Sequence, residues 1–471
     1  MSRRILFALT IALVAASCNR VSSPPPIVIR YAGVNEDTEE IINDRMNGLR
    51  KYEIRPDGTK VFSRNGREYH FARLPSPDYR GADDVLTLAL SAQTATMRPA
   101  AGLYFVDLYW FKTFEPEWLV PFDGEGWRAS QFKEDFIKVC YLGEGAQRRL
   151  YAIPFSAKGN LLFYRRDLLK LLNDAKPPET WDELVRQIEK LRSLTDQEPA
   201  LRNVKYGLLF HWRHLANDFY PIMWGFGGEI LSADEAKRAR AMDALYMLKS
   251  LVHIGKRERI PFTPTAEELE ERFGREEMRL LQCFAAGEAV FMINWDNRLD
   301  KMRKYADATV APQQVGVAPV PRGTEKVSAS NIGSWGWVIS QRPDREDQWT
   351  SGAEVVATIQ EFVNDLTSAE AQEWLAANHG YIPSRKIELS EKAQKKIEDL
   401  GPGTVEAFGL FADTARIRFL DRPHNKRVND IVEYALKEAI LAPFIEGELE
   451  RKSLARRLEM ARRRAEVFIS E

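Results

Sequence analysis

The chain has 471 residues, more than one hydrophobic core normally serves, so its length predicts two or three domains. Its 67 basic and 68 acidic residues give a net charge of −1, and this balance gives no support for nucleic-acid binding. Hydrophobic residues make up 44% of the chain, which is typical of an ordinary globular protein.

The first residues carry the features of an export signal. Ser2-Arg3-Arg4 is a short basic segment, and residues 5–16 form a largely apolar run. A helix that spans a bilayer needs about 20 apolar residues, so this run is too short to be one. Small residues at 15–17 stand directly before Cys18, as at a signal cleavage site, and residues 1–17 are therefore expected to be a signal peptide.

The position of Cys18 predicts a lipid anchor. A cysteine directly after the small residues is typical of a lipobox, in which the thiol is acylated. Residues 18–26, which are rich in proline, would then be a lipidated tether for an exported protein on the periplasmic or external side of the membrane. The alternatives are a plain cleaved signal with an incidental Cys18, and export by the twin-arginine route, which Arg3-Arg4 would suit.

Only two cysteines, Cys140 and Cys283, follow Cys18. In an exported protein they could pair as a disulfide or remain as two buried free thiols. No zinc-type spacing of cysteine and histidine is present, and no cofactor is expected.

Turn signals punctuate the beginning of the folded part. Pro56-Asp57-Gly58 and Asn65-Gly66 lie between short alternating segments, which predicts one or two β-hairpins within residues 52–74. The other elements expected in this part are a strand at 27–32, a helix at 36–49, a helix at 83–97 and a strand at 102–107.

Beyond residue 150, predicted strands alternate with predicted helices. Thr180 and Glu183 form a capping-box pattern that should begin a helix. Strands are expected at 150–155, 161–164, 204–210, 289–293, 315–319 and 335–340, and helices at 215–223, 236–253, 266–286, 354–366, 370–377, 390–400, 429–441 and 449–469. This alternation predicts α/β lobes, each a mixed, mostly parallel sheet with helices on both faces and ligands at the carboxyl ends of the strands.

Several segments, in a fixed order, carry a resemblance to a known family. They are LYFVDLYW at 103–110 with WLVPFD at 118–123; YAIPF at 151–155 with LLFYRRDL at 161–168 and PETWDEL at 178–184; FAAGEAVFM at 284–292 with Trp295; VGVAPVP at 315–321 with GSWGW at 333–337; and GYIPSR at 380–385. Together they resemble the extracellular solute-binding proteins of bacterial ABC importers, of the sugar-binding type that includes the maltose- and trehalose-binding lipoproteins.

The resemblance implies a two-lobed fold of the periplasmic-binding-protein type (type II). It also implies a monomer without enzymatic activity that captures a carbohydrate-like solute between hinged lobes and delivers it to membrane permease subunits. In the family the chain crosses between lobes three times, and the crossings carried over fall near 154–158, 319–322 and 380–384. The first lobe would then be 27–155 with 320–380, and the second 156–319 with 381–471. Residues 52–74 depart from the family's pattern, which has a long helix and a second strand there.

Sugar recognition calls for planar polar groups beside aromatic faces, because a sugar presents paired hydroxyls and flat C–H patches. The resemblance assigns a ligand-binding carboxylate to Asp107, whose alternative role is a helix cap or a loop hydrogen bond. Trp295 and Trp335 match stacking tryptophans, with a core position as the alternative. Tyr109 follows Asp107 and is a further candidate for the ligand site.

Four more candidates come from the same comparison. Asn35 and Glu36 follow the first strand, where the family has a polar contact. Arg422 matches an arginine that forks onto sugar hydroxyls, or else it pairs with Asp421. Lys158 stands where many sugar binders carry an acidic residue, and its ammonium would favour an anionic solute such as a glycerol phosphate unless it points to solvent.

Two rival functions remain open at this point. One is a solute sensor that presents its closed lobes to a receptor, and the other is a secreted enzyme acting on glycans. His211 and His214 are spaced as a metal pair, but no further ligand stands near them, so no metal site is expected. The chain contains no His-Glu-x-x-His, phosphate-loop or Gly-x-Ser-x-Gly motif, which argues against an enzyme.

Overall fold

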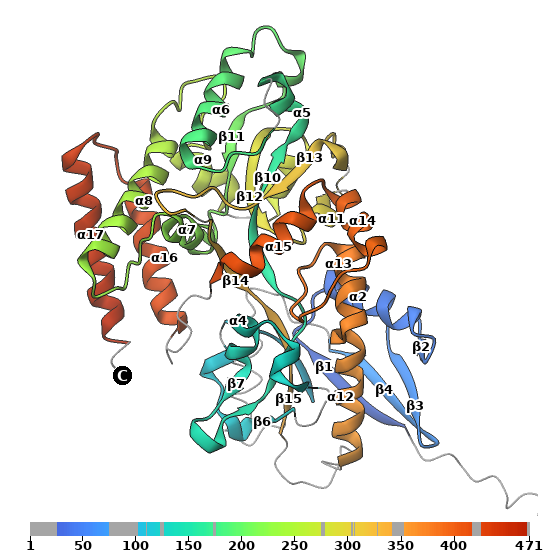
Figure 1. Ribbon diagram of the computed structural model, residues 1–471. Helices are drawn as coiled ribbons and strands as arrows, with labels where there is room; N and C mark the ends of the chain where they lie inside the picture. Colours follow the sequence, from blue (N-terminus) through green and yellow to red (C-terminus); the bar gives the residue numbers. More distant parts are fainter. Residues whose placement is uncertain are drawn as a thin grey trace, which may run out of the picture. The chain divides into compact units, whose positions relative to one another are not determined.

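The computed structural model describes most of the chain as two compact units (Figure 1). The first unit comprises Met1–Phe105 and Ile339–Phe362, and the second comprises Val106–Val338 and Val363–Glu471. The described residues are 26–74, 102–109, 111–122, 127–172, 176–274, 278–302, 305, 307–326, 328–341, 353–416 and 425–468. The predicted signal peptide, Cys18, the helix expected at 83–97 and Arg422 lie outside these ranges. The lobe boundaries inferred from the resemblance stay a prediction.

The sheet of the first unit runs in the order β2-β3-β4-β1-β5. Its strands are β1 (Ile27–Ala32), β2 (Tyr52–Ile54), β3 (Lys60–Arg64), β4 (Arg67–Arg73) and β5 (Leu103–Asp107), whose last two residues belong to the second unit. β2, β3 and β4 are antiparallel to one another, which confirms the hairpins predicted from the turn signals. β1 lies between β4 and β5 and is parallel to both, so the hairpins extend a parallel core.

Two helices contribute to the first unit. α2 (Glu36–Gly48) begins at Asn35, whose side chain accepts the Thr38 N–H at 2.9 Å. α12 (Ala353–Thr367) belongs to this unit as far as Phe362. The Phe362 ring stacks on Phe71 with centroids 4.1 Å apart and an interplanar angle of 8°, and this stack fixes the helix against β4.

A buried lysine joins the added hairpin to the rest of the first unit. Lys60 in β3 is 0% exposed, and its ammonium donates to the hydroxyl of Tyr31 in β1 at 2.5 Å. It also pairs with the carboxylate of Glu39 in α2, which accepts the Tyr31 O–H at 2.7 Å. Burial lowers the pKa of Lys60, and Glu39 opposes that effect. A strand, a hairpin and a helix therefore depend on one ion pair.

Removing the carboxylate should destabilise this unit, because Lys60 would be left buried without a counter-charge. We expect Glu39→Ala to cost about 3–5 kcal/mol, as is usual when one partner of a buried pair is removed. Glu361→Ala is the matched control, since Glu361 pairs with Lys51 at 3.0 Å with both side chains about one-third exposed; it should cost less than about 1 kcal/mol. Native-state hydrogen exchange of the β3 amides measures both, and equal losses would contradict the assignment.

The sheet of the second unit runs in the order β11-β12-β10-β14-β16, with β13 also paired to β10. Its strands are β10 (Lys158–Arg165), β11 (Tyr206–Leu209), β12 (Ala289–Trp295), β13 (Val315–Ala318), β14 (Ser330–Gly333) and β16 (Ala415–Arg416). β10 is antiparallel to β12, β13 and β14, whereas β11–β12 and β14–β16 are parallel pairs, so this sheet is mixed. β14 and β16 were not predicted from the sequence.

Further strands belong wholly or mostly to the second unit. They are β6 (Leu119–Val120), β7 (Tyr141–Leu142), β8 (Arg149–Leu150), β9 (Ala152–Pro154) and β15 (Trp335–Ser340), whose last two residues belong to the first unit. β9 and β15 pair in antiparallel orientation through Gly336 and Pro154.

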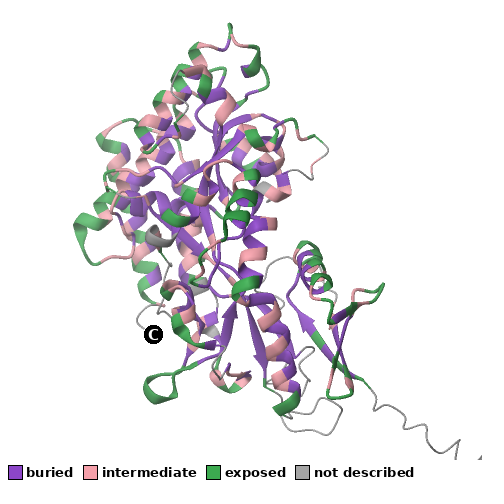
Figure 2. Cartoon of the chain, turned by 45° about the vertical axis from the view of Figure 1, so that its right-hand side comes forward, coloured by how far each residue is buried: buried purple, intermediate pink, exposed green. Residues whose placement is uncertain are grey.

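Helices surround the sheet of the second unit. They are α4 (Glu134–Ile137), α5 (Arg166–Leu169), α6 (Trp181–Ser193), α7 (Leu215–Gly225), α8 (Glu235–His253), α9 (Ala266–Glu268), α10 (Arg279–Ala285), α11 (Arg298–Met302), α13 (Ala369–His379), α14 (Glu391–Leu400), α15 (Thr404–Thr414), α16 (Asn425–Leu441) and α17 (Glu448–Glu466). α6 begins with the predicted Thr180–Glu183 capping box. Buried residues concentrate in the strands and on the inner sides of the helices (Figure 2).

The prediction of a single helix at 266–286 is wrong. α9 passes into one π-helical segment, Leu269–Phe273, and α10 starts afresh at Arg279. The apolar spacing suggested one helix, but the π turn changes the face that its residues present. α15 was missed altogether; it begins after Gly403, which has a φ of +89°.

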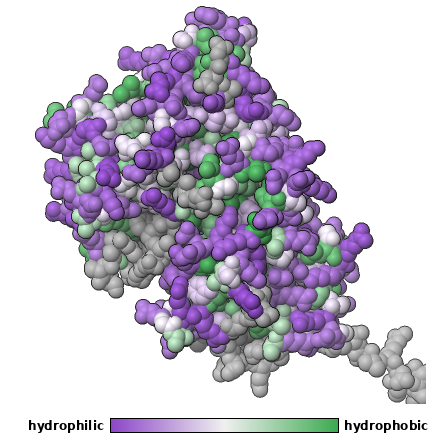
Figure 3. All heavy atoms as spheres, viewed as in Figure 1, coloured by the Kyte–Doolittle hydropathy of each residue, from purple (hydrophilic) through white to green (hydrophobic). Residues whose placement is uncertain are grey.

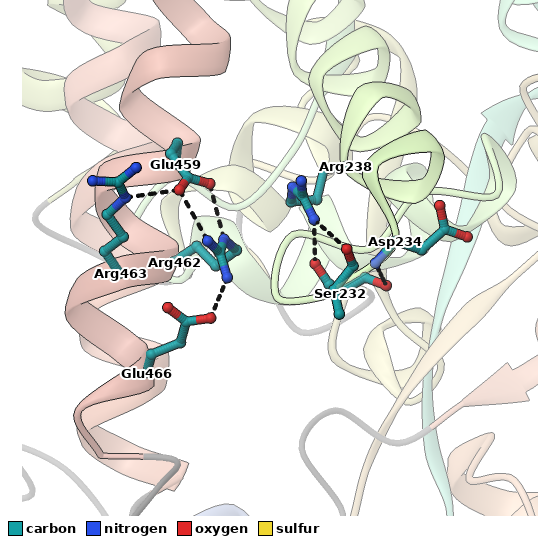
Figure 4. Close-up of polar contacts among 8 residues, drawn as sticks. Ser232, Asp234, Arg238, Glu459, Arg462, Arg463 and Glu466 are labelled. Carbon is teal, nitrogen blue, oxygen red and sulfur yellow. Dashed lines mark hydrogen bonds and ion pairs between the residues drawn. The ribbon is translucent and has the colours of Figure 1, made fainter.

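Ion pairs between neighbouring turns stabilise α17, which is rich in arginine. Glu459 accepts hydrogen bonds from Arg462 at 2.9 Å and from Arg463 at 2.8 Å, and Arg462 also pairs with Glu466 (Figure 4). Pairs at these spacings support a helix by a few tenths of a kcal/mol each. Hydrophilic residues predominate on the face in Figure 3, in line with such solvated helices.

The helices and the cysteines allow two further statements about the described residues. Within those ranges, no helix combines the length and the apolar character that a membrane span requires. Cys140 and Cys283 are both free and buried, so the thiol alternative is the one observed. Burial raises the pKa of Cys283 to about 11 and raises that of Cys140 still further.

Candidate functional site

One face of β10 and its neighbours gathers the candidate side chains of the second unit. In the antiparallel register, Asn160 of β10 lies opposite Trp295 of β12, and Lys158 lies opposite Gly333 of β14. Directly opposed residues share a face, and so do residues two apart along a strand. Lys158, Asn160, Trp295 and Gly333 therefore lie on the same side of the sheet.

Trp295 spans two strands of this face. A Cβ atom built on Gly333 would lie 2.9 Å from the outer edge of the indole ring, so only glycine leaves room for the ring there. The side chain is half-buried, whereas the preceding residues of β12 are buried. Trp295 thus combines a fixed position with an accessible surface, which a stacking residue requires.

Lys158 and Asp296 form the charged part of the site. Lys158 is half-buried, with its ammonium 5.6 Å from the centre of the Tyr381 ring. Burial and the charge of Arg298 lower the pKa of Lys158 to about 8, while the Asp296 and Asp107 carboxylates act in the opposite direction. The lysine is therefore held among charged groups.

Asp296 follows Trp295 directly and was not predicted from the sequence. It is 1% exposed; its Oδ2 accepts the Ile382 N–H at 2.8 Å, and its Oδ1 has no hydrogen-bond partner. Burial raises the pKa of Asp296 to about 7, with the Ile382 N–H and Lys158 opposing the shift. The signal that could have identified it is the one used for Asp107, a carboxylate at the end of a buried strand.

Two of the three predicted crossing segments lie side by side here. Ala157 and Ile382 form a β-bridge, and the Ser384 hydroxyl donates to Pro154 O at 3.2 Å. Gln372 of α13 holds both segments, because its amide donates to Phe155 O and its Oε1 accepts the Ser384 N–H at 2.7 Å. The third segment lies elsewhere, where Arg322 bridges to Thr180.

Asp107 and Tyr109 lie in a turn of the second unit that contacts Ser334, the residue before Trp335. The Asp107 carboxylate accepts the Tyr109 N–H at 2.9 Å, so the loop hydrogen bond foreseen as its alternative role is present. The next residue, Leu108, donates its N–H to Ser334 O at 2.8 Å, which places this turn against the start of β15. Tyr109 is buried and Trp335 is half-buried.

The remaining predicted residues belong to the first unit or lie outside the described residues, and their role stays a prediction. Asn35 caps α2 in the first unit, and Glu36 is the exposed first residue of that helix. Arg422 lies outside the described residues. His211 is buried; its ring Nδ1 lies 3.4 Å from Asp218. No cluster of metal-ligating residues occurs in the ranges that the structure describes.

A pocket elsewhere in the second unit contains none of the predicted site residues. It is lined by Trp212, Glu270, Glu271, Gly274 and Lys437, next to the π-helical segment. Three of its polar side chains already have partners: the Trp212 indole N–H donates to Glu270 at 2.7 Å, and Lys437 pairs with Glu433 at 2.9 Å. We therefore place the candidate site at β10.

Solved structures define the class of fold. T. maritima MalE3, solved with maltose, matches with a TM-score of 0.66 over 92% of this chain and 99% of its own, at 22% identity. UgpB from Mycobacterium tuberculosis, in complex with glycerophosphocholine, matches with a TM-score of 0.66 over 95% and 99%, at 14% identity. The chain has the two-lobed α/β fold of periplasmic binding proteins, as the sequence predicted.

The family follows from the sequence match. Residues 75–373 fit the family described as bacterial extracellular solute-binding protein, and the chain belongs to this family. It is a family of binding proteins and not of enzymes, which removes the glycan-active enzyme from consideration. A binding protein of Brucella abortus is 23% identical over 309 residues, which cover 64% of this chain and 66% of that protein. The match thus spans just under two thirds of that relative's length.

Asp296 should make the stability of the ligand-free protein depend on pH. Its folded pKa is raised, so its contribution is complete below about pH 4, the usual aspartate range, and is lost as the pH rises to about 7. Asp296→Asn keeps the neutral form throughout. The melting temperature of the parent should therefore fall relative to that of the variant between pH 4 and 7, by about 2 °C or more.

Asp57→Asn is the control for this titration. Asp57 is exposed, and the Thr59 N–H lowers its pKa, so its titration lies towards the acidic end of this range and below it. The difference from the parent should then stay level over most of the same range. A level difference for Asp296→Asn as well would show that its carboxylate is not held neutral by burial.

Proposed function

We propose that the protein is the substrate-binding lipoprotein of an ABC importer, capturing a carbohydrate-like solute and passing it to a membrane permease. Family membership supports the binding role. A Deinococcus radiodurans protein described as an ABC transporter-binding protein is 25% identical over 244 residues, half of this chain, which supports the transporter. The observation that carries the proposal is Trp295, half-buried beside Lys158 and the strand-end carboxylate of Asp296.

The mechanism proposed is closure of two lobes around the solute. Contacts made by both lobes would favour the closed form, which would then dock on the permease. Hinge segments at 154–158 and 380–384 suit this role, because Gln372 keeps them together while the adjoining residues rotate. Gly380, with a φ of +69°, ends α13 and begins the second of these segments.

A second candidate for the solute is an anionic or zwitterionic compound such as a glycerol phosphate. The observation in its favour is Lys158, whose ammonium is a compact partner for phosphate. The glycerophosphocholine complex of the structurally similar UgpB points in the same direction. Asp296 and Asp107 near Lys158 reduce the positive charge available, so the neutral solute is preferred.

Binding should depend on Trp295 more than folding does. A thermal-shift screen of sugars, polyols and glycerol phosphates, followed by calorimetry, identifies the solute. We expect Trp295→Ala to weaken its binding about ten- to a hundred-fold, or about 1–3 kcal/mol, because a stacking face is lost. The same should hold for Trp335→Ala. Trp337 is fully buried in the same strand as Trp335, so Trp337→Ala should instead cost stability, about 3–5 kcal/mol.

If Trp295→Ala and Trp335→Ala bind the solute with normal affinity but melt at a temperature as low as that of Trp337→Ala, neither tryptophan belongs to the solute site. A parent protein that binds no compound of the screen would count against a carbohydrate-like or phosphorylated solute altogether.

Lipid anchoring is tested separately, at Cys18. Replacing its thiol removes the atom that would be acylated, so Cys18→Ala should release the protein from the membrane or leave the signal uncleaved. Fractionation and mass spectrometry of the exported protein measure this. Ser17→Ala keeps a small residue at the cleavage site and should behave like the parent. Unchanged membrane attachment of Cys18→Ala would exclude a lipid anchor at this position.

A further inference from the structure

β14 carries an asparagine whose side chain makes no hydrogen bond to any residue that the structure describes. Asn331 is 0% exposed, and neither its Oδ1 nor its Nδ2 has a partner. Burying a polar group without a partner destabilises a fold, so such groups are uncommon unless they serve another purpose. Since the whole amide is unused, Asn331 is a donor and an acceptor available to something that the protein binds.

The strand pattern places Asn331 on the same face as Trp295. Gly333, two residues further along, lies beneath the indole ring. Ile332, between them, lies opposite Gly159, on the other side of the sheet, where the Phe411 ring of α15 packs against that glycine. Since successive residues of a strand alternate, Asn331 points to the Trp295 side.

Asn160 is the neighbour of Asn331 on this face. Lys158 pairs with Gly333 and Gly159 with Ile332, so Asn160 and Asn331 are the next pair in register. Asn160 is 0% exposed; its Nδ2 donates to Asp218 Oδ1 at 2.7 Å, and its Oδ1 has no partner. Asp218 is itself held by the His211 N–H at 2.6 Å. The Asn160 amide is therefore fixed by α7 with its acceptor left unused.

These amides have the chemistry that a sugar or polyol requires. A hydroxyl group donates one hydrogen bond and accepts others, and two adjacent hydroxyls match one amide, with Nδ2 donating to the first and Oδ1 accepting from the second. Here a complete amide and a second acceptor lie beside an aromatic ring. The charged groups that an ionic part of the solute would need are Lys158, two residues before Asn160 in the chain, and Asp296, directly after Trp295.

We propose that Asn331 and Asn160 form a subsite that binds two adjacent hydroxyl groups of the solute while its ring stacks on Trp295. This inference rests on the proposed function and specifies the solute as a vicinal diol, neutral or charged elsewhere. Trp295, Lys158 and Gly333 are the partly exposed residues of this face, and α7 packs against β14 and β10, so entry to the subsite requires side chains at this edge to move. Asn331 determines specificity, and Asp218 acts as a positioning residue through Asn160.

The test uses a substitution whose effects on stability and on binding have opposite signs. Asn331→Leu replaces an unpaired amide by an apolar group of similar size. The ligand-free variant should melt at the same temperature as the parent or higher, because no hydrogen bond is lost and two unpaired polar atoms are removed. Its affinity for maltose, trehalose, myo-inositol or glycerophosphocholine, whichever the parent binds, should fall at least tenfold, equivalent to about 1.4 kcal/mol.

Ile332→Val is the matched control on the opposite face of the same strand. It should lower the melting temperature slightly and leave the affinity unchanged. A melting temperature of Asn331→Leu below that of Ile332→Val would show that the amide only holds a structural water, and would overturn the subsite. Equal affinities of Asn331→Leu and the parent would overturn it too, while leaving the proposed transport function intact. A parent that binds none of these compounds would instead contradict the proposed solute class.

Discussion

Strand β10 pairs with antiparallel neighbours on both sides, and the register of these pairings decides what the candidate site contains. Opposite β10 stand Trp295 on β12 and Gly333 on β14, and the indole ring lies over the glycine. A slip of one residue would turn Lys158 and Asn160 towards α15 and bring Gly159 to the site face. The helices and loops around the sheet supply partners such as Asp218 and Ile382, but the strand pairing fixes which side chains they meet.

Buried polar groups fall into two kinds in this protein. The Lys60, Glu39 and Tyr31 side chains satisfy one another and join three elements of the first unit. At β10, by contrast, atoms of Asn331 and Asp296 are buried without partners. Full pairing is what a structural network needs, since an unpaired group there would only cost stability. Unpaired buried atoms also occur elsewhere in the described residues, for example at Asn43 and Gln187, so at β10 they count only together with the neighbouring Trp295.

Most of the fold was predictable from local signals. The Thr180–Glu183 capping box, the turns at Gly58 and Gly66 and the β-branched first strand all formed as expected. The prediction of one continuous helix at 266–286 was wrong, because apolar spacing does not reveal a π turn. Among the candidate site residues, Trp295 and Lys158 were proposed from family segments. Asn160 and Asn331 were not proposed from the sequence, because a lone asparagine in a strand gains meaning only when the register with its neighbours is known.

The state of the cysteines has a practical consequence for measuring motion in this protein. Cys140 and Cys283 are buried, and burial disfavours the thiolate that reacts with maleimides or iodoacetamides. In a version that begins after Cys18, a cysteine introduced at an exposed position would therefore be the preferred target of a thiol-reactive dye. Pairs of dyes placed in this way could follow distances in single molecules without first removing the native thiols.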